Sequence, residues 1–384
     1  MRRFDIARVL ARARSSFGSG VMTTLLLGCW CQDSPPSAVR QLPSNQEPTA
    51  SHPIPQFDVH VHLSQGAAER LKSLMDRYHV RTVVNLSGGT VDTGLREQLA
   101  QAQRYPGRIL VFASLAYHQA EHADYGQRMA EDLRRAHAAG ARGLKIAKLL
   151  GLGLRRADGS LIPVDDPQLD LVFETAAELA MPVAIHTGDP LAFWDPVSPA
   201  NERFAELRAH PSWSLHGRAV PSFDELYGQL ERRVARHPRT TFISVHFGNC
   251  AEQPWRVARS LRRFANLYVD TAARIPELGR HDPAEMRAFF EEFQDRILYG
   301  SDLGVGPGST PLFLGSSGQT PPGPSDVERF FTSTRRYFET EARQFPHPTP
   351  IQGDWRIDGI GLSEEILRKV YYENAERLFA STAE

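Results

Sequence analysis

The chain has 384 residues, of which 41% are hydrophobic and 23% are charged, as in an ordinary globular protein. Its 44 basic and 45 acidic residues leave a formal net charge of −1, which argues against nucleic acid as a partner, because nucleic-acid-binding proteins present a basic surface. The length allows several domains, but one α/β barrel can also accommodate most of it.

The first 54 residues differ in composition from the rest of the chain. Several arginines precede a short apolar run at residues 21–27, which ends at Gly28 and Cys29. The run is too short to span a bilayer, which takes about 20 apolar residues, and the pattern is typical of a secretory signal. The sequence Leu-Leu-Gly-Cys at residues 26–29 also resembles the bacterial lipobox, in which the cysteine is lipidated. We therefore predict a lipoprotein-type signal peptide at residues 1–28, with a plain signal peptide or a true start at Met22 as alternatives.

Residues 29–54 are predicted to be a flexible linker, because they are rich in proline, serine and glutamine and have no apolar period. The mature protein would contact the membrane only through a lipid anchor at Cys29, in the bacterial periplasm or cell envelope. The catalytic domain would span residues 55–384. It contains one cysteine, Cys250, so neither a disulfide framework nor a zinc ribbon can form in it.

From residue 56 onward, short β-branched runs alternate with longer amphipathic segments. The expected strands are residues 56–62, 81–86, 109–115, 142–147, 183–186, 241–246, 267–271 and 297–301. The expected helices are residues 67–78, 94–105, 123–139, 167–180, 222–237, 254–264, 283–294, 325–343 and a C-terminal helix at 363–379. Strands separated by helices of this length pair in parallel, so eight units predict a (β/α)8 TIM barrel. An open doubly wound sheet is the alternative, but the first strand is not followed by the glycine-rich turn of a dinucleotide site.

Two connections are too long to be simple turns. Residues 187–221 follow the fifth strand and residues 303–324 follow the eighth. Both would lie at the carboxyl ends of the strands, where barrel enzymes carry their substrate loops.

The first strand contains two histidines two residues apart, His60 and His62, in the sequence FDVHVH at residues 57–62. Side chains alternate across a strand, so these two imidazoles point to the same side. Two imidazoles in this arrangement can bind one cation together. A pair of core or surface histidines is the alternative.

Polar residues also end the fifth, sixth and eighth strands: His186, His246 and Asp302. In a barrel, these positions converge at the catalytic face. A buried group of imidazoles and carboxylate is costly unless it is paired or bound to a metal. The pattern therefore indicates a metal site.

These residues, together with the sequences PVAIHTG (182–188), VHFGN (245–249), LYGSD (298–302) and YYENAERLF (371–379), resemble the amidohydrolase superfamily. Within it, they are similar to the amidohydrolase-related branch (amidohydrolase 2), which contains metal-dependent hydrolases and decarboxylases. The resemblance extends over residues 55–380 and implies the fold and the metal site, but not the substrate.

The resemblance implies that His60, His62, His186 and Asp302 bind one divalent metal. Three imidazoles and one carboxylate suggest zinc first, with iron and manganese as alternatives. His246 would polarise the substrate or assist in activating water. Asp302 would also accept the proton of the metal-bound water.

Three further residues have open roles. Some superfamily members carry a carboxylated lysine on the fourth strand that bridges two metals, and Lys145 stands there; His186 and His246 would then bind the second metal. Alternatively, Lys145 binds an anionic substrate group or pairs with Asp302. Arg274, after the seventh strand, would clamp a substrate carboxylate or form a structural salt bridge. Asp58 would orient a ligand or merely begin the strand.

The expected function is hydrolysis of a C–N or C–O bond in a small molecule by metal-activated water. Non-oxidative decarboxylation of an aromatic or unsaturated acid is the main alternative, because it uses the same ligands. A metal-free lactonase and a non-catalytic binding lipoprotein are further alternatives. The chain could also pair as a homodimer.

Overall fold

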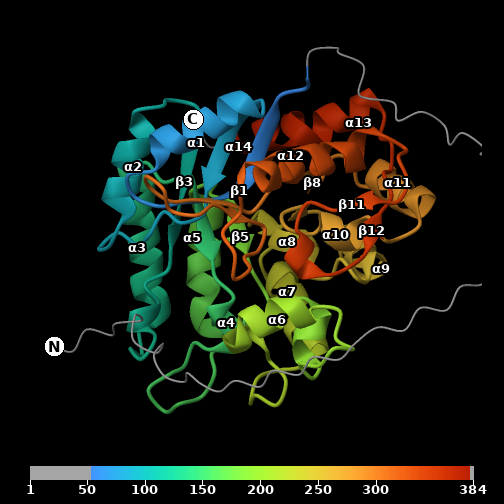
Figure 1. Ribbon diagram of the computed structural model, residues 1–384. Coiled ribbons are helices and arrows are strands. Elements are labelled where there is room, and N and C mark those ends of the chain that lie inside the picture. Colours follow the sequence, from blue (N-terminus) through green and yellow to red (C-terminus); the bar gives the residue numbers. More distant parts are fainter. Residues whose placement is uncertain (1–52, 381–384) are drawn as a thin grey trace, which may run out of the picture. The chain divides into compact units, whose positions relative to one another are not determined.

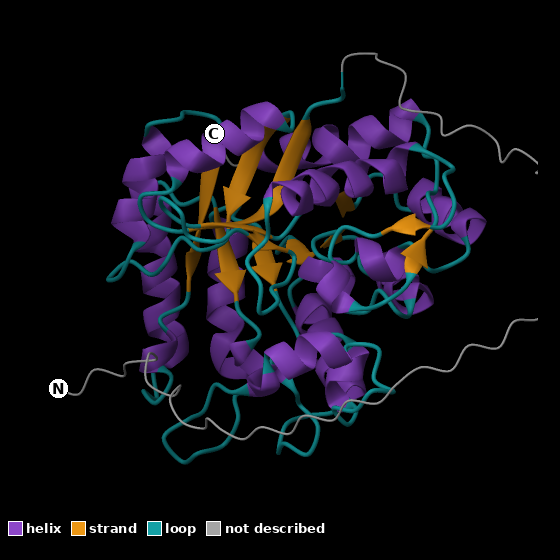
Figure 2. Ribbon diagram, viewed as in Figure 1, coloured by secondary structure: helices purple, strands orange, loops and turns teal. Residues whose placement is uncertain are grey.

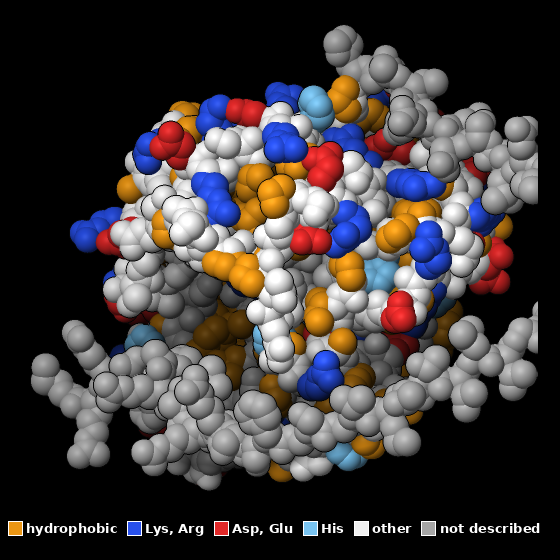
Figure 3. Space-filling view, in the orientation of Figure 1, with side chains coloured by type: hydrophobic (Ala, Val, Ile, Leu, Met, Phe, Trp, Pro, Cys, Tyr) orange, Lys and Arg blue, Asp and Glu red, His pale blue; other side chains and the backbone are white. Residues whose placement is uncertain are grey.

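The structure is a computed structural model that describes residues 53–380. The predicted signal peptide, the Cys29 anchor and the linker up to residue 52 lie outside the described residues. Within residues 53–380, no helix is both long and apolar enough to cross a membrane. Figure 3 shows acidic and basic side chains mixed on the face in view, in agreement with the balanced net charge.

A curled sheet of parallel strands occupies the centre of the described domain (Figure 1). Its strands are β1 (Gln56–Leu63), β2 (Val80–Asn85), β3 (Ile109–Ser114), β4 (Gly143–Ile146), β5 (Val183–Ile185), β6 (Phe242–Ser244), β7 (Leu267–Asp270) and β8 (Ile297–Leu298). Each strand pairs in parallel with the next one in the chain. Valine and isoleucine are common in these segments because β-branched side chains pack well on a pleated surface. The predicted (β/α)8 barrel is confirmed.

The barrel closes between β8 and β1 through residues 299–305. The amide of Asp302 donates to the carbonyl of His60 at 2.9 Å. β9 (Leu303–Val305) then pairs in parallel with β1, and β10 (Phe313–Leu314) pairs antiparallel with β9. The connection predicted at residues 303–324 therefore begins as a hairpin that extends the barrel wall.

The eighth strand is shorter than predicted: it ends at Leu298 instead of residue 301. Asp302 has a positive φ of 64°, which turns the backbone away from a regular strand. Gly300 lies between Leu298 and Asp302 in the sequence, and a Cβ atom added to it would be only 3.1 Å from the Cβ of His60. The absence of a side chain at Gly300 lets the end of the eighth strand approach the first.

Helices surround the sheet, as the secondary-structure view shows (Figure 2). The longer ones are α1 (Ala68–Arg77), α2 (Leu95–Gln103), α3 (Tyr125–Ala139), α5 (Asp170–Glu178), α7 (Phe223–Arg236), α9 (Pro254–Arg263), α11 (Pro283–Glu292) and α12 (Pro324–Glu339). Short elements complete the domain: η1 (Tyr117–Gln119), α4 (Leu149–Leu152), η2 (Pro167–Leu169), α8 (Val245–Gly248), α10 (Ile275–Leu278), β11 (Phe345–Pro346), η5 (Pro350–Gln352) and β12 (Arg356–Ile357). Several begin at side-chain caps; the Ser222 hydroxyl, for example, accepts from the amide of Glu225.

The predicted C-terminal helix is three segments rather than one. α13 (Glu364–Arg368) and α14 (Asn374–Ala380) are joined by the π-helix η6 (Lys369–Glu373). The Asn374 amide donates to the carbonyls of Gln294 and Ile297, which fixes this end to β8. α14 also supplies Phe379 to a buried cluster whose other members come mainly from the strands. The end of the chain therefore helps to fill the barrel.

The connection after β5 forms a small substructure. It contains η3 (Leu191–Trp194), α6 (Phe204–Ala209) and η4 (Pro211–Trp213), and has its own buried cluster of Phe193, Leu207 and Leu215. Fully buried Arg203 forms an ion pair with Glu206 within this substructure and another with Glu277 of α10, and the second pair fixes the substructure to the barrel. We call residues 187–221 the β5 insertion.

Candidate metal centre and substrate cavity

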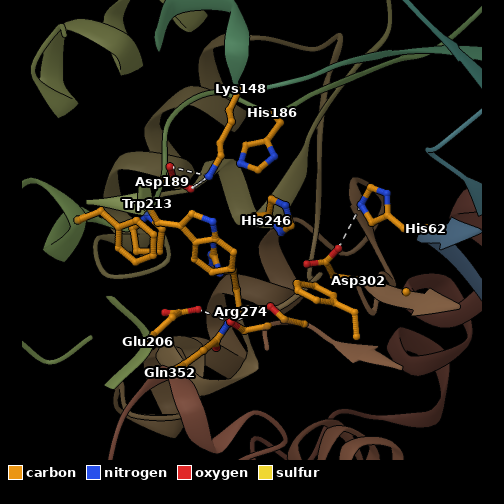
Figure 4. Close-up of a pocket in the computed structure, with 16 residues that line it drawn as sticks. His62, Lys148, His186, Asp189, Glu206, Trp213, His246, Arg274, Asp302 and Gln352 are labelled. Atoms are coloured by element: carbon orange, nitrogen blue, oxygen red, sulfur yellow. Dashed lines mark hydrogen bonds and ion pairs between the residues drawn. The ribbon is translucent and has the colours of Figure 1, made fainter. Parts of the chain in front are cut away.

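The five predicted histidine and aspartate residues lie together at the carboxyl ends of the strands. The Nε2 atoms of His60 and His62 lie 3.5 Å and 3.3 Å from Oδ1 of Asp302. The ring of His246 is centred 4.5 Å from that of His60 and 4.6 Å from that of His186. Figure 4 shows His62, His186, His246 and Asp302 around one cavity. His186 joins the group through His246, whereas His60 and His62 adjoin Asp302 directly.

The Nδ1 atoms of three of these imidazoles have hydrogen-bond partners. Nδ1 of His62 lies 2.7 Å from the hydroxyl oxygen of Ser87, and the other two identify their tautomers. Nδ1 of His246 lies 3.0 Å from the carbonyl oxygen of Ala272, and Nδ1 of His60 lies 2.9 Å from Oδ2 of Asp270. A carbonyl oxygen can only accept, and a carboxylate accepts as well, so both Nδ1 atoms carry the proton. The neutral rings then present the lone pair of Nε2, which is the form that binds a cation.

Burial keeps these imidazoles neutral. It lowers the pKa of His60, His186 and His246 well below the usual value for histidine, and neighbouring cationic groups lower it further. His60 is fully buried, whereas the side chain of His62 keeps 36% of its exposure. Three buried neutral imidazoles thus adjoin one more accessible ring.

Asp302 has the opposite charge preference. Burial alone would raise its pKa, but the hydrogen bond from His62 opposes burial, and the pKa of Asp302 lies below the usual value for aspartate. The residue is an ionised carboxylate beside neutral imidazoles. Such a mixed set of nitrogen and oxygen donors suits a divalent transition metal.

Two of these residues have strained backbones. His246 has a φ of 56° and Asp302 a φ of 64°, a region that residues other than glycine rarely adopt. The amide of His246 donates to Asp270 at 2.7 Å, and the amide of Asp302 donates to His60, which holds both conformations. Strained backbone of this kind collects at functional sites.

Asp270, at the end of β7, is a site residue to which sequence reasoning assigned no role. It is fully buried, and its two oxygens accept from the ring of His60 and from the amides of His246 and Ala272. One carboxylate therefore orients two of the histidines. The signal was present in the sequence, because Asp270 ends an apolar strand as His186, His246 and Asp302 do.

Asp58 contacts backbone rather than an imidazole. Its Oδ1 accepts from the amides of His60 and Ser301 at 3.0 Å each, and its Oδ2 accepts from the Ser301 hydroxyl at 2.5 Å. Burial raises its pKa to about 7. Asp58 thus holds the first and eighth strands together beneath the site.

Lys145 is buried in β4, and its Nζ has no hydrogen-bond partner among the described residues. Burial lowers its pKa to about 8, against the opposing attraction of Asp270 and Asp302. The alternative in which Lys145 pairs with Asp302 is not observed as a close ion pair within residues 53–380. Lys145 is nevertheless close to the site, because its positive charge helps to lower the pKa of His60 and of His186.

Arg274 lines the cavity although only 5% of it is exposed. Its guanidinium donates to Oδ1 of Asn249 at 2.8 Å and to the carbonyl of Ala273 at 3.0 Å, and its Nε has no partner among the described residues. Arg274 makes no salt bridge with a carboxylate of the described residues. This argues against the alternative that Arg274 serves only to form a structural salt bridge.

The cavity has a volume of about 380 Å³. Its lining residues are His62, Lys148, His186, Asp189, Pro190, Phe193, Glu206, Trp213, His246, Arg274, Asp302, Gly304, Phe313, Gly315, Ser316 and Gln352. Asp189, Glu206 and Trp213 come from the β5 insertion and were not predicted as site residues. Nothing in their local sequence marks them, because the fold of the insertion brings them to the cavity.

Comparison with solved structures gives the fold. An uncharacterised TIM-barrel protein from Bordetella bronchiseptica is 15% identical, with a TM-score of 0.51 over 86% of this chain and 99% of that one. A dihydroxybenzoic acid decarboxylase from a Polaromonas species, solved with manganese and the inhibitor 2-nitroresorcinol, is 14% identical, with a TM-score of 0.50 over 86% and 98% of the two chains.

No curated protein matches the chain. The sequence model described as amidohydrolase matches residues 57–380, which include every strand of the barrel except the first residue of β1 and every candidate metal ligand. The chain belongs to the amidohydrolase family.

Proposed function

We propose that the protein is a metal-dependent hydrolase that cleaves a C–N or C–O bond of a small molecule. One divalent cation would be held by His60, His62, His186 and Asp302. The observation that carries the proposal is the convergence of neutral imidazoles on one ionised carboxylate at the floor of a cavity.

The residues fit such an ion. The Nε2 atoms of His60 and His186 are buried without a hydrogen-bond partner among the described residues. Burying a lone pair without a partner costs free energy, and one cation would bind the lone pairs of both Nε2 atoms. Three imidazoles and a carboxylate favour zinc, with manganese and iron as alternatives. A two-metal site remains the alternative if Lys145 is carboxylated.

A bound cation of this kind supplies a water molecule with a pKa of about 7. The chain's own residues would do the remaining work. Asp302, an ionised carboxylate 3.3 Å from Nε2 of His62, would take a proton from water and pass it to the leaving group.

The geometry narrows the role of His246. Because its Nδ1 proton is donated to Ala272, a neutral ring offers an acceptor, not a donor, at Nε2. His246 therefore suits assistance in activating water better than polarising a substrate carbonyl, which would require a protonated ring.

The test is elemental analysis of the purified protein, combined with assays on esters and amides before and after chelation. We expect about one metal per chain and loss of activity on chelation, with recovery when zinc or manganese is added. Full activity in a metal-free sample would refute the proposal and favour the metal-free lactonase. A count of two metals would support the carboxylated Lys145.

Non-oxidative decarboxylation is the second candidate. Arg274 favours it, because a buried guanidinium without a carboxylate partner in the cavity suits an acidic substrate. The Polaromonas relative is a decarboxylase, which motivates the comparison without deciding it. Measuring carbon dioxide release against acid, alcohol or amine release on the same substrates separates the two reactions.

The leader supports a second, independent proposal about location. Residues 1–28 would direct export, and lipidation at Cys29 would anchor the protein to the cell envelope. Replacing Cys29 with alanine should move the protein from the membrane fraction to the soluble fraction and abolish labelling by a fatty acid. A full-length, unlabelled wild-type protein in the cytoplasm would contradict this.

A further inference from the structure

A second cavity adjoins the one that contains the candidate metal ligands. Its volume is about 550 Å³, and it shares Lys148, Asp189 and Trp213 with the first cavity. We call it the outer cavity. The same three side chains therefore border both spaces.

The shared wall is built from side chains of the connections. Nζ of Lys148 donates to both oxygens of Asp189 at 2.7 Å and 2.8 Å, and lies 5.7 Å from the ring centre of Trp213. Trp213 stacks on His210 with ring centres 3.9 Å apart. Figure 4 shows Lys148, Asp189 and Trp213 across the cavity from His62 and Asp302.

The lining of the outer cavity is largely apolar, through Leu149, Leu152, Leu215 and Val220. Leu149 is 42% exposed and is one of the few large hydrophobic side chains that is exposed in the described residues. Covering such side chains with an apolar ligand is favourable, because it removes them from water. The surface therefore suits an apolar body rather than a hydrated one.

Two arginines add charge to this apolar lining. Arg155 donates to the carbonyl of Gly159 at 2.7 Å, and Arg218 donates to the carbonyl of Ser212 at 2.8 Å. Neither makes an ion pair with a carboxylate within residues 53–380. The acidic residue among the lining side chains, Asp189, is already paired with Lys148. The cavity thus has two cationic groups that form no ion pair with a carboxylate of the described residues.

We propose that the outer cavity is a subsite for an amphiphilic carboxylate. The apolar or aromatic body would lie on the leucines and Trp213, and the carboxylate would be bound by Arg155 and Arg218, whose forked guanidinium donors match it. This deepens the proposed function, on which it rests for the reaction itself: the substrate would be elongated, with its reacting bond at the histidines and its acidic end in the outer cavity. Binding energy gathered there would hold the reacting bond in place.

Calorimetric titration of the purified, metal-loaded protein tests the subsite without relying on turnover. The probes are 4-phenylbutyrate and its neutral amide, 4-phenylbutyramide. We expect the acid to bind at least about tenfold more tightly than the amide, because charge-assisted hydrogen bonds to guanidinium are strong. The double variant R155A/R218A should lose this preference. R239A, which removes an exposed arginine that lines neither cavity, should keep it.

A second arm separates the outer cavity from the metal centre. In Asp302→Asn, the acid should still bind with its preference intact, because the outer cavity does not include Asp302. In Trp213→Ala, both probes should bind more weakly, because both use the ring. Equal binding of acid and amide to the wild type, or an unchanged preference in R155A/R218A, would overturn the subsite. A preserved pattern in a protein that proves to have no hydrolase activity would refute the proposed function alone.

Discussion

The two sides of the cavity that contains the candidate metal ligands are built from different parts of the fold. On one side, His62, His186, His246 and Asp302 stand at the ends of barrel strands. On the other, Lys148, Asp189 and Trp213 stand on the connections after β4 and β5. The strand ends are held by backbone hydrogen bonds of the sheet, whereas the connections are held mainly by side-chain pairs and their own small core.

This difference suggests a division of labour. Groups that perform chemistry must keep their geometry to within a fraction of an ångström, and strand ends of a closed barrel provide that rigidity. Groups that select a substrate can change with the connections while the barrel stays the same. We therefore expect changes on the strand side to abolish activity, and changes on the insertion side to alter affinity or stability.

The largest effect is expected from Asp302→Asn. The change removes a proposed metal ligand and proton acceptor, so activity should fall by at least about 10³-fold and the metal content should drop. The measurements are the turnover rate and elemental analysis. Asp195→Asn, an exposed aspartate of the β5 insertion, is the control and should keep both. Wild-type activity in Asp302→Asn would contradict the assignment of the chemistry to the strand ends.

Next in size is the effect of Arg203→Met on stability. The change leaves the buried carboxylates of Glu206 and Glu277 without their shared cation, which should cost about 3–5 kcal/mol in the free energy of unfolding. Urea denaturation measures it, with Arg208→Met, also in the insertion, as the matched control. An unchanged unfolding free energy would show that the insertion is held by its apolar cluster instead.

A third prediction compares one aspartate from each side. Asp270→Asn weakens the acceptor that orients His60 and His246 and should reduce metal affinity or activity by about 10–100-fold. Asp189→Asn weakens only the pair with Lys148, so it should raise KM and leave kcat and metal content near those of the wild type. If Asp189→Asn instead lowered kcat as strongly as Asp270→Asn, the proposed division of labour would be wrong.

The smallest effect is expected at Cys250, a buried residue that lines neither the cavity of the candidate metal ligands nor the outer cavity. Burial raises its pKa to about 12, so the native thiol stays protonated and unreactive at pH 8. A thiol reagent should label it only after unfolding, and Cys250→Ala should retain full activity. Rapid labelling of the native protein accompanied by inactivation would revive a nucleophilic role.

Much of the barrel follows from local sequence. The alternation of β-branched runs with amphipathic segments predicted all eight strand positions, because side-chain periodicity is set by neighbours along the chain. The same locality predicted His60 and His62 on one side of a strand. Positions at strand ends then pointed to His186, His246 and Asp302, since parallel strands of a barrel end on one face.

Only the tertiary structure determined the contacts between segments that lie far apart in the chain. Asp270 reaches His60 across 210 residues, and Asp58 reaches Ser301 across 243. The backbone turn at Asp302, which follows the eighth strand, is held by the hydrogen bond from its amide to the carbonyl of His60. The outer cavity exists because the β5 insertion folds back over the connection that follows β4. No periodicity records such pairings, because they depend on how the barrel closes and not on which residues are adjacent.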